Sequence, residues 1–190
     1  GVIEELLKIK NLIALRGNHD EWMLSAVKNG YHPAPEYFME TARSYREHKN
    51  EYRETMHADP DYGCPVPKKH REFLESQIDF YVDKHRRLFV HAGIRLDMEI
   101  GEQNSDIFYW DRNMVRKALS IPKKSVTRLK DVNNFEQIFI GHTPTITVNK
   151  DCARPLYKGQ VVMCDTGAVF GGYLSLIDIT TPHEHILYQS

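Results

Sequence analysis

The spacing of apolar residues changes between helical and strand periods near the start of the chain. Residues 2–10 place apolar side chains at helical spacing, which predicts an amphipathic helix. The apolar run 11–15 predicts a buried strand, and residues 20–28 predict a second helix, because acidic residues open it and Asn29-Gly30 ends it. This order predicts a strand–turn–helix unit that presents its turn at the edge of a sheet.

Two further apolar runs end in the same kind of turn. Residues 87–90 lead into His-Ala-Gly at 91–93, and residues 137–140 lead into Gly-His-Thr at 141–143. With Gly-Asn-His-Asp at 17–20, three predicted strands end in a His beside Gly. One such turn is weak evidence for a metal site, since Asn, Gly and Asp are ordinary turn formers and a lone His is more often a surface residue. The three together favour one metal site.

The remaining pattern predicts helices at 67–77 and 105–119, the second with Ser105 as its N-cap. Consecutive strands after the βα units predict an α/β sandwich rather than one parallel sheet. Residues 31–65, whose first part is low in aliphatic side chains, predict a helical insertion, either a cap over the site or a solvated hairpin. The other expected strands are 78–82, 161–164, 173–179 and 185–188.

Composition narrows the class of protein. A chain of 190 residues can bury one core, so a single domain over 1–190 is expected. A net charge of −1 gives no sequence-wide attraction to nucleic acid or to an anionic membrane, and no apolar stretch could span a bilayer. Three cysteines without a C-x-x-C spacing disfavour a disulfide framework and fit a reducing cytosol. We therefore expect a cytoplasmic protein without nucleic-acid or membrane partners.

Several residues are expected to be structural. Arg16 is expected in an ion pair, Cys164 in the core, and the basic clusters 68–71 and 84–87 in solvated turns. Asp83-Lys84-His85 is interpreted as a polar turn. Histidines without a strand-end context are predicted to be surface residues: His32, His48, His57, His70, His183 and His185.

The motifs at 17–20, 91–93 and 141–144 resemble the phosphoprotein-phosphatase branch of the calcineurin-like metallophosphoesterases, in particular the bacterial serine/threonine phosphatase and diadenosine tetraphosphatase-like group. The runs Tyr-Trp-Asp-Arg at 109–112 and Asp-Thr-Gly-Ala-Val-Phe-Gly-Gly at 165–172 are also similar to that group. The resemblance implies a four-layer α/β/β/α sandwich flanked by helices. The family motifs GDxHG and GDxxDRG do not occur, so the sequence is expected to be N-terminally truncated, beginning just after the second of them.

The resemblance also implies roles for individual residues. Asn18, His91 and His142 would bind one metal ion. His19 would be the general acid toward the leaving alkoxide, a role that suits a group titrating near neutrality. Asp20 stands beside it as a catalytic candidate, although its place in the first helical turn also fits a structural role.

The resemblance implies two more site residues and the cofactors. Arg112 would bind phosphate in a bidentate manner, with an arginine on the helix surface as the alternative. Asp165 would accept a hydrogen bond from the ring of a histidine that ligates the metal. Two divalent metals are expected in the full-length enzyme, Mn first and Fe or Zn as alternatives. The second metal would use ligands from the absent motifs, so this chain retains ligands for only one.

The expected function is metal-dependent hydrolysis of phosphomonoesters, with phosphoserine or phosphothreonine in proteins, or a small phosphoester, as substrate. One alternative is symmetrical hydrolysis of diadenosine tetraphosphate. Another is an inactive fragment or a phosphate-binding pseudoenzyme, because ligands of the upstream motifs are absent. A truncated sheet would expose an unpaired edge, so self-association is also expected.

Overall fold

The computed structural model describes residues 1–29, 41, 43–45, 47, 66–122, 127–148, 153–181 and 185–189. The chain divides into two compact units, Gly1–Ile78 and Asp79–Ser190. Of the insertion expected at 31–65, only residues 41, 43–45 and 47 are described, and these are helical; the rest of it lies outside the described residues. Within the described segments, none of the helices is both long and apolar enough to cross a lipid bilayer.

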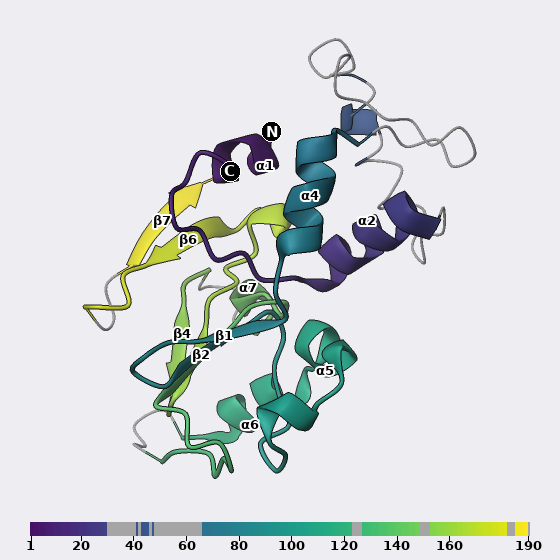
Figure 1. Ribbon diagram of the computed structural model, residues 1–190. Helices are drawn as coiled ribbons and strands as arrows, with labels where there is room; N and C mark the ends of the chain where they lie inside the picture. Colours follow the sequence, from purple (N-terminus) through teal and green to yellow (C-terminus); the bar gives the residue numbers. More distant parts are fainter. Residues whose placement is uncertain are drawn as a thin grey trace. The chain divides into compact units, whose positions relative to one another are not determined.

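The first unit is built from helices (Figure 1). Its elements are α1 (Val2–Leu6), α2 (Asn18–Asn29) and α4 (Lys68–Ser76). Met23 and Leu24 of α2 pack against Leu74 of α4 in a small buried cluster. The three predicted helices are confirmed, with α1 shorter than expected and α2 beginning two residues earlier.

The strand predicted at 11–15 does not form. Only Leu15 pairs, in an isolated parallel bridge with Ile78. The amide of Arg16 donates to the carbonyl of Ile78 at 2.8 Å, and the amide of Ile78 donates to the carbonyl of Ala14 at 3.0 Å. The prediction was wrong because an apolar run becomes a strand only when a partner strand extends alongside it, and in the described part of the chain only Ile78 bonds to it. Leu12 and Ile13 are exposed instead of buried.

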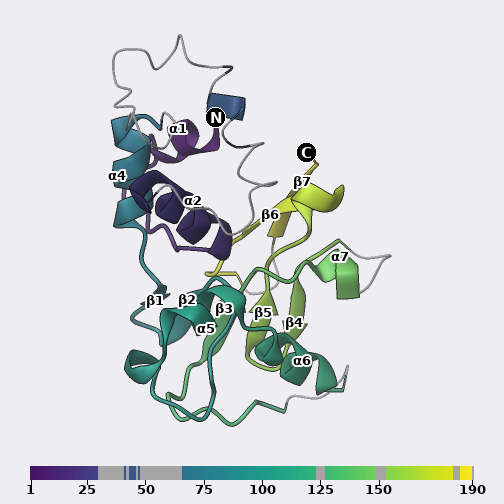
Figure 2. The same ribbon diagram turned by 90° about the vertical axis from the view of Figure 1, so that its right-hand side faces the viewer.

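The second unit contains a five-stranded mixed sheet with strand order β1-β2-β3-β5-β4 (Figure 2). The three central strands, β2, β3 and β5, are parallel, and both edge strands are antiparallel to their neighbours. A separate antiparallel pair, β6 and β7, follows. The bounds are β1 (Phe80–Val82), β2 (Arg87–Val90), β3 (Gln137–Ile140), β4 (Leu156–Lys158), β5 (Val161–Met163), β6 (Tyr173–Ile177) and β7 (His185–Gln189).

This arrangement confirms a mixed α/β fold and all the strands predicted after residue 77, while β4 was not predicted. One face of the sheet carries alternate residues of the three parallel strands, and all of them are buried: Leu88, Val90, Ile138, Ile140, Val161 and Met163. They form one core with residues of two helices, α5 (Ser105–Trp110) and α6 (Asn113–Ser120). Burial of the central strands explains their unbroken apolar runs. Two short 3₁₀ turns, Ile100–Glu102 and Ala168–Phe170, and α7 (Thr145–Val148) complete the unit.

The helix predicted at 105–119 is two helices. It breaks at Asp111, whose backbone is extended with ψ of 134°, and Oδ2 of Asp111 accepts a hydrogen bond from the amide of Met114 at 2.8 Å. Asp111 thereby satisfies an amide in the first turn of α6, as N-cap residues do. The predicted N-cap was also displaced by one residue: Asn104 accepts from the amide of Asp106 at 2.9 Å. The break takes Arg112 out of a regular helix.

Two surface predictions are wrong. The basic cluster 68–71 lies in α4, and His70 is buried, with 3% of its surface exposed. Nε2 of His70 lies 2.7 Å from Oε1 of Glu4, and Nδ1 lies 3.1 Å from the hydroxyl of Tyr45. A buried imidazole is tolerated because it is hydrogen-bonded, and its partners come from distant parts of the sequence.

The polar turn at Asp83 is confirmed, since its carboxylate accepts from the amides of His85 and Arg87 at 2.9 Å each.

Candidate metal and phosphate site

The histidine-bearing turns after β2 and β3 lie at one edge of the sheet. The two strands are adjacent and parallel, and their last residues, Val90 and Ile140, pair with each other. His91 follows β2 directly and His142 follows β3 after Gly141. The amide of Gly141 donates to the carbonyl of His91 at 2.7 Å, which joins the turns beyond the strand ends. The carboxyl ends of parallel strands are where ligand sites collect in open α/β sheets.

The two imidazoles form a close pair. Nε2 of His91 lies 3.3 Å from Nδ1 of His142, and the ring centroids are 5.1 Å apart. His142 has φ of 62°, in the left-handed region that few non-glycine residues adopt. The amide of Thr143 donates to the carbonyl of Gly141 at 2.6 Å, so His142 is the central residue of a γ-turn with positive φ, a rare and strained form. Such strain is typical of positions where a side chain must be held for function.

Arg112 and Trp110 approach the same imidazole. Nε of Arg112 lies 3.5 Å from Nε2 of His142, at the limit of a hydrogen bond. The ring of Trp110 stands edge-to-face against His142, with centroids 5.8 Å apart and planes at 84°. Both side chains are exposed, and they flank the break between α5 and α6. His142 is therefore contacted by an imidazole, a guanidinium and an indole.

Gly93 explains how the break is held near the histidines. A Cβ placed on Gly93 would lie 2.7 Å from Oδ2 of Asp111 and 3.1 Å from Cβ of Met114, closer than real side chains allow. The backbone after His91 therefore passes directly against the carboxylate that caps α6. Glycine is needed at position 93 because the backbone lies close to Asp111 and Met114. This close approach fixes the position of Arg112, which follows Asp111.

The end of β5 adds Asp165 beside this site. A Cβ on Gly141 would lie 3.9 Å from Cβ of Asp165, so Asp165 neighbours the residue before His142. Oδ1 of Asp165 accepts from the amide of Gly167 at 2.9 Å, and its carbonyl accepts from the amide of Thr145 at 2.7 Å. These contacts brace the turn after His142. A hydrogen bond from a ligand histidine to Asp165 remains a prediction.

Cys164 is not a reactive thiol. Burial raises the pKa of its thiol to about 12, and the nearby charge of Asp165 acts in the same direction. The thiolate is the nucleophilic and metal-binding form of cysteine. Cys164 is therefore excluded as a nucleophile at neutral pH, although it lies at the end of a central strand.

In the first unit, the Gly-Asn-His-Asp motif forms the start of α2. Oδ2 of Asp20 accepts from the amide of Gly17 at 2.9 Å, and the amide of Glu21 donates to the carbonyl of Gly17 at 3.0 Å. The first contact is the half of a capping box that the N3 residue makes, and the second is the first hydrogen bond of the helix, so Asp20 has the structural role that its position allowed. Asn18 is buried, whereas His19 is exposed, with its ring 5.1 Å from that of Trp22.

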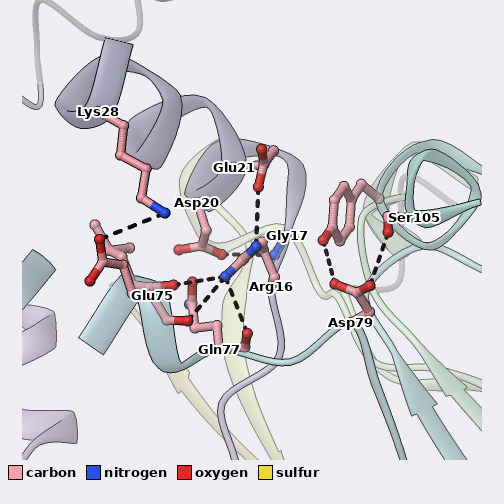
Figure 3. A network of polar contacts seen from close by, with 11 residues as sticks. Arg16, Gly17, Asp20, Glu21, Lys28, Glu75, Gln77, Asp79 and Ser105 are labelled. Atoms are coloured by element: carbon pink, nitrogen blue, oxygen red, sulfur yellow. Dashed lines mark hydrogen bonds and ion pairs between the residues drawn. The ribbon is translucent and has the colours of Figure 1, made fainter. Parts of the chain in front are cut away.

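Arg16 anchors this turn to the end of α4 (Figure 3). Its Nη2 donates to the carbonyls of Leu74, Glu75 and Gln77 at 3.2, 3.4 and 3.2 Å. Its Nη1 lies 3.4 Å from Oε2 of Glu21. A cationic side chain at the last carbonyls of a helix satisfies acceptors that have no intrahelical donor. The expected structural ion pair is confirmed, with a helix-capping function in addition.

The structure thus groups the candidate residues in two sets. His91, His142 and Arg112 lie together in the second unit, with Asp165 nearby, whereas Asn18, His19 and Asp20 are consecutive in the first. Sharing of one metal between the two sets remains a prediction. Among the described residues, no three His, Cys, Asp or Glu side chains group as a metal site. Trp110 was not predicted as a site residue, although the quoted run 109–112 contains it.

The histidine pair nevertheless fits a metal. Two nitrogens at about 2.0–2.1 Å from one tetrahedral ion lie about 3.3 Å apart. The separation of 3.3 Å between the two imidazole nitrogens equals that spacing. The same distance fits an N–H···N hydrogen bond between neutral rings, so loading a metal requires the rings to turn their lone pairs toward the ion but not to move apart.

Comparison with known proteins gives one result on the fold. No family model matches the chain, and no curated protein matches it. A solved structure described as "Crystal structure of a putative diadenosine tetraphosphatase" superposes with a TM-score of 0.58 and 14% sequence identity, covering 99% of this chain and 73% of that chain. At this identity the likeness shows a shared fold. The chain therefore has the mixed α/β fold of that protein, in agreement with the predicted phosphoesterase-like fold.

Proposed function

We propose that this protein is a metal-dependent phosphoesterase. The observation that carries the proposal is the pair of imidazole nitrogens of His91 and His142 at 3.3 Å, with the guanidinium of Arg112 at the same ring. Metal-ligating nitrogens beside a phosphate-binding cation are the groups that phosphoryl transfer needs. The fold shared with a protein described as a putative diadenosine tetraphosphatase supports the same class. The four-layer α/β/β/α sandwich is part of the proposal.

His91 and His142 would hold the metal, with the side-chain oxygen of Asn18 as a further ligand. Nitrogen with a few oxygen ligands favours Mn, Fe or Zn over Ca, whose ligands are oxygens. When bound, the metal would neutralise charge on the phosphoryl group and activate the nucleophile, and a second metal would complete the site. His19, exposed at the start of α2, would donate a proton to the leaving oxygen.

Arg112 would bind phosphate oxygens through its fork of N–H donors. His142 can ligate a metal through Nδ1 only when its proton is on Nε2. In that tautomer Nε2 no longer accepts from Nε of Arg112, the contact seen at 3.5 Å. The guanidinium is then available to phosphate. Loading of the histidine pair and binding of phosphate by Arg112 are therefore coupled.

The proposed substrates are phosphomonoesters, first among them phosphoserine and phosphothreonine in proteins. Diadenosine tetraphosphate is the second substrate to test, because the protein with the shared fold is described by that activity. Release of nucleoside diphosphate faster than phosphopeptide turnover would favour the second over the first.

The test is Mn²⁺-dependent hydrolysis of p-nitrophenyl phosphate by the full chain. His142→Ala should abolish turnover, whereas His85→Ala, which removes an exposed imidazole from the turn after β1, should not. His19→Ala should lower turnover and leave metal affinity unchanged. A chain that binds phosphate but turns over no substrate with Mn²⁺, Fe²⁺ or Zn²⁺ would be the inactive fragment or the phosphate-binding pseudoenzyme, and the activity proposed for these 190 residues would be wrong.

A further inference from the structure

We propose that the indole of Trp110 is a subsite for a planar ring attached to the phosphate that Arg112 binds. The ring is either an aryl group or a nucleobase, which share a flat π-face. The inference rests on the proposed function and deepens it, because it adds a class of leaving group, one that carries a planar ring, to the phosphomonoesters proposed above.

The first observation is the exposure of Trp110 directly after two buried aromatic residues of the same helix. Trp110 is 39% exposed, whereas its neighbours Phe108 and Tyr109 are 2% and 4% exposed. Trp110 is also the last residue of α5, where the chain leaves the helix. A large aromatic surface left in contact with solvent is commonly used for binding when it lies beside polar functional groups.

The second observation is what the indole stands against. It contacts His142 edge-to-face at 5.8 Å, and Nε of Arg112 lies 3.5 Å from the same imidazole. Ring and phosphate subsites therefore share His142 as their common neighbour. A ligand whose ring is joined to phosphate through one or a few bonds can reach both, whereas phosphoserine has no ring to offer.

The third observation is that the helix carrying Trp110 is fixed. The hydroxyl of Tyr109 donates to Oδ1 of Asp79 at 2.5 Å, and the hydroxyl of Ser105 donates to Oδ2 of Asp79 at 3.0 Å, the second of which is drawn in Figure 3. Both hydrogen bonds tie α5 to the residue before β1. A platform held in this way loses little entropy when a ring stacks on it.

Stacking on the indole can be measured without turnover. The chain has two tryptophans, so Trp22→Phe leaves Trp110 as the single tryptophan, whose indole can be excited selectively over the tyrosines. Phenyl phosphate or AMP should change the emission of Trp110 in this variant, and glycerol 2-phosphate, which has a phosphomonoester but no ring, should change it far less. A response to phenyl phosphate alone limits the subsite to small rings, and a response to both extends it to nucleobases. Equal responses to all three ligands, or none, would overturn the proposal.

Kinetics separate this subsite from the activity itself. Trp110→Ala should lower kcat/KM for phenyl phosphate at least about fivefold more than kcat/KM for glycerol 2-phosphate, and Trp110→Phe should recover most of the difference, because stacking on an aromatic side chain supplies it. Equal losses on both substrates would overturn the ring subsite while hydrolysis remains. Absence of hydrolysis in every variant would contradict the proposed function alone, and the emission titration would still decide the subsite.

Discussion

Nε2 of His91 and Nδ1 of His142 lie 3.3 Å apart at the carboxyl ends of two adjacent parallel strands. The parallel strands bring both histidines to the same edge of the sheet. The γ-turn at His142, with φ of 62° and a hydrogen bond from the amide of Thr143 to the carbonyl of Gly141, then sets the position of its imidazole beside that of His91. A pair built on two strand ends is held by the sheet itself, which is the rigidity that a metal site requires.

We expect His91→Ala and His142→Ala each to weaken Co²⁺ or Zn²⁺ binding at least about tenfold, because each removes one of the two nitrogens at ligand spacing. Calorimetric titration measures the affinity, and the d–d spectrum of Co²⁺ reports the loss of a nitrogen ligand. His85→Ala is the matched control, as its exposed imidazole lies in the polar turn beside Asp83. Unchanged affinity in both pair variants would refute the assignment.

Arg112→Ala should weaken binding of inorganic phosphate by about fivefold or more, since charge-assisted contacts to phosphate oxygens are lost. Because His142 releases Arg112 only in its metal-binding tautomer, Mn²⁺ should raise phosphate affinity more in the unmodified chain than in the variant. Arg116→Ala is the control: this exposed arginine of α6 donates to Oδ1 of Asn113 at 2.7 Å. An equal loss of phosphate affinity in both variants would show that Arg112 acts only through its positive charge on the surface and not as a specific phosphate ligand.

Gly93→Ala should destabilise the protein by about 1–3 kcal/mol, the usual effect of overpacking. The added Cβ would meet Oδ2 of Asp111 at 2.7 Å and must displace the carboxylate that caps α6. Phosphate binding should fall as well, because Arg112 follows Asp111. Gly101→Ala tests the same substitution where a Cβ would meet nothing within 4 Å, and urea unfolding of the two variants gives the comparison. A stable Gly93→Ala with normal phosphate affinity would separate this glycine from Arg112.

The limits of sequence reasoning follow from where each element finds its partners. The strands at β2, β3 and β5 were predictable because one face of all three is buried and the other is at least partly buried, which leaves apolar runs of three residues. The run 11–15 is also apolar after its first residue, but a strand also depends on pairing that is remote in sequence. His70 is buried by a contact with Glu4, 66 residues away, which no local pattern reports. The helix break at Asp111, in contrast, has a local signal, an Asp three residues before the amide that it caps.

The site divides in the same way. Histidines at strand ends were predictable because adjacent parallel strands end together, so His91 and His142 are neighbours. The contact of Trp110 with His142 depends on the break between α5 and α6 and was missed for that reason.

Thr145→Val should be neutral or stabilising by about 1 kcal/mol, because Oγ1 of Thr145 is fully buried with no hydrogen-bond partner among the described residues and valine has nearly the same shape. Thr166→Val is the matched substitution at an equally buried threonine whose hydroxyl does donate, to the carbonyl of Tyr173. That variant should lose about 1–2 kcal/mol, since a buried acceptor loses its donor. Urea unfolding at pH 7 measures both. A loss in Thr145→Val as large as in Thr166→Val would mean that the Thr145 hydroxyl is satisfied in solution.

Glu4 joins α1 to α4 and should give the first unit an acid-sensitive contact. Its Oε2 lies 2.7 Å from Nζ of Lys69 and its Oε1 lies 2.7 Å from Nε2 of His70. The hydrogen bond from Lys69 lowers the pKa of Glu4 below that of an ordinary glutamate, partial burial opposes this, and His70 lowers the pKa further. A carboxyl whose pKa is lower in the folded state stabilises fully above its unfolded pKa, and this stabilisation is lost as the pH falls through the folded value.

Glu4→Gln should therefore lower the free energy of unfolding by about 1 kcal/mol at pH 7, with the buried imidazole left without its charged partner. The deficit should shrink as the pH falls below about 4, where the protonated carboxyl resembles the amide of glutamine. Urea unfolding at pH 7, 5 and 3.5 follows the difference. Glu5→Gln is the control, because Glu5 pairs with Lys8 on a surface where both side chains are mostly exposed. A Glu4→Gln deficit that stays constant between pH 7 and 3.5 would show that the contact stabilises by packing and not by charge.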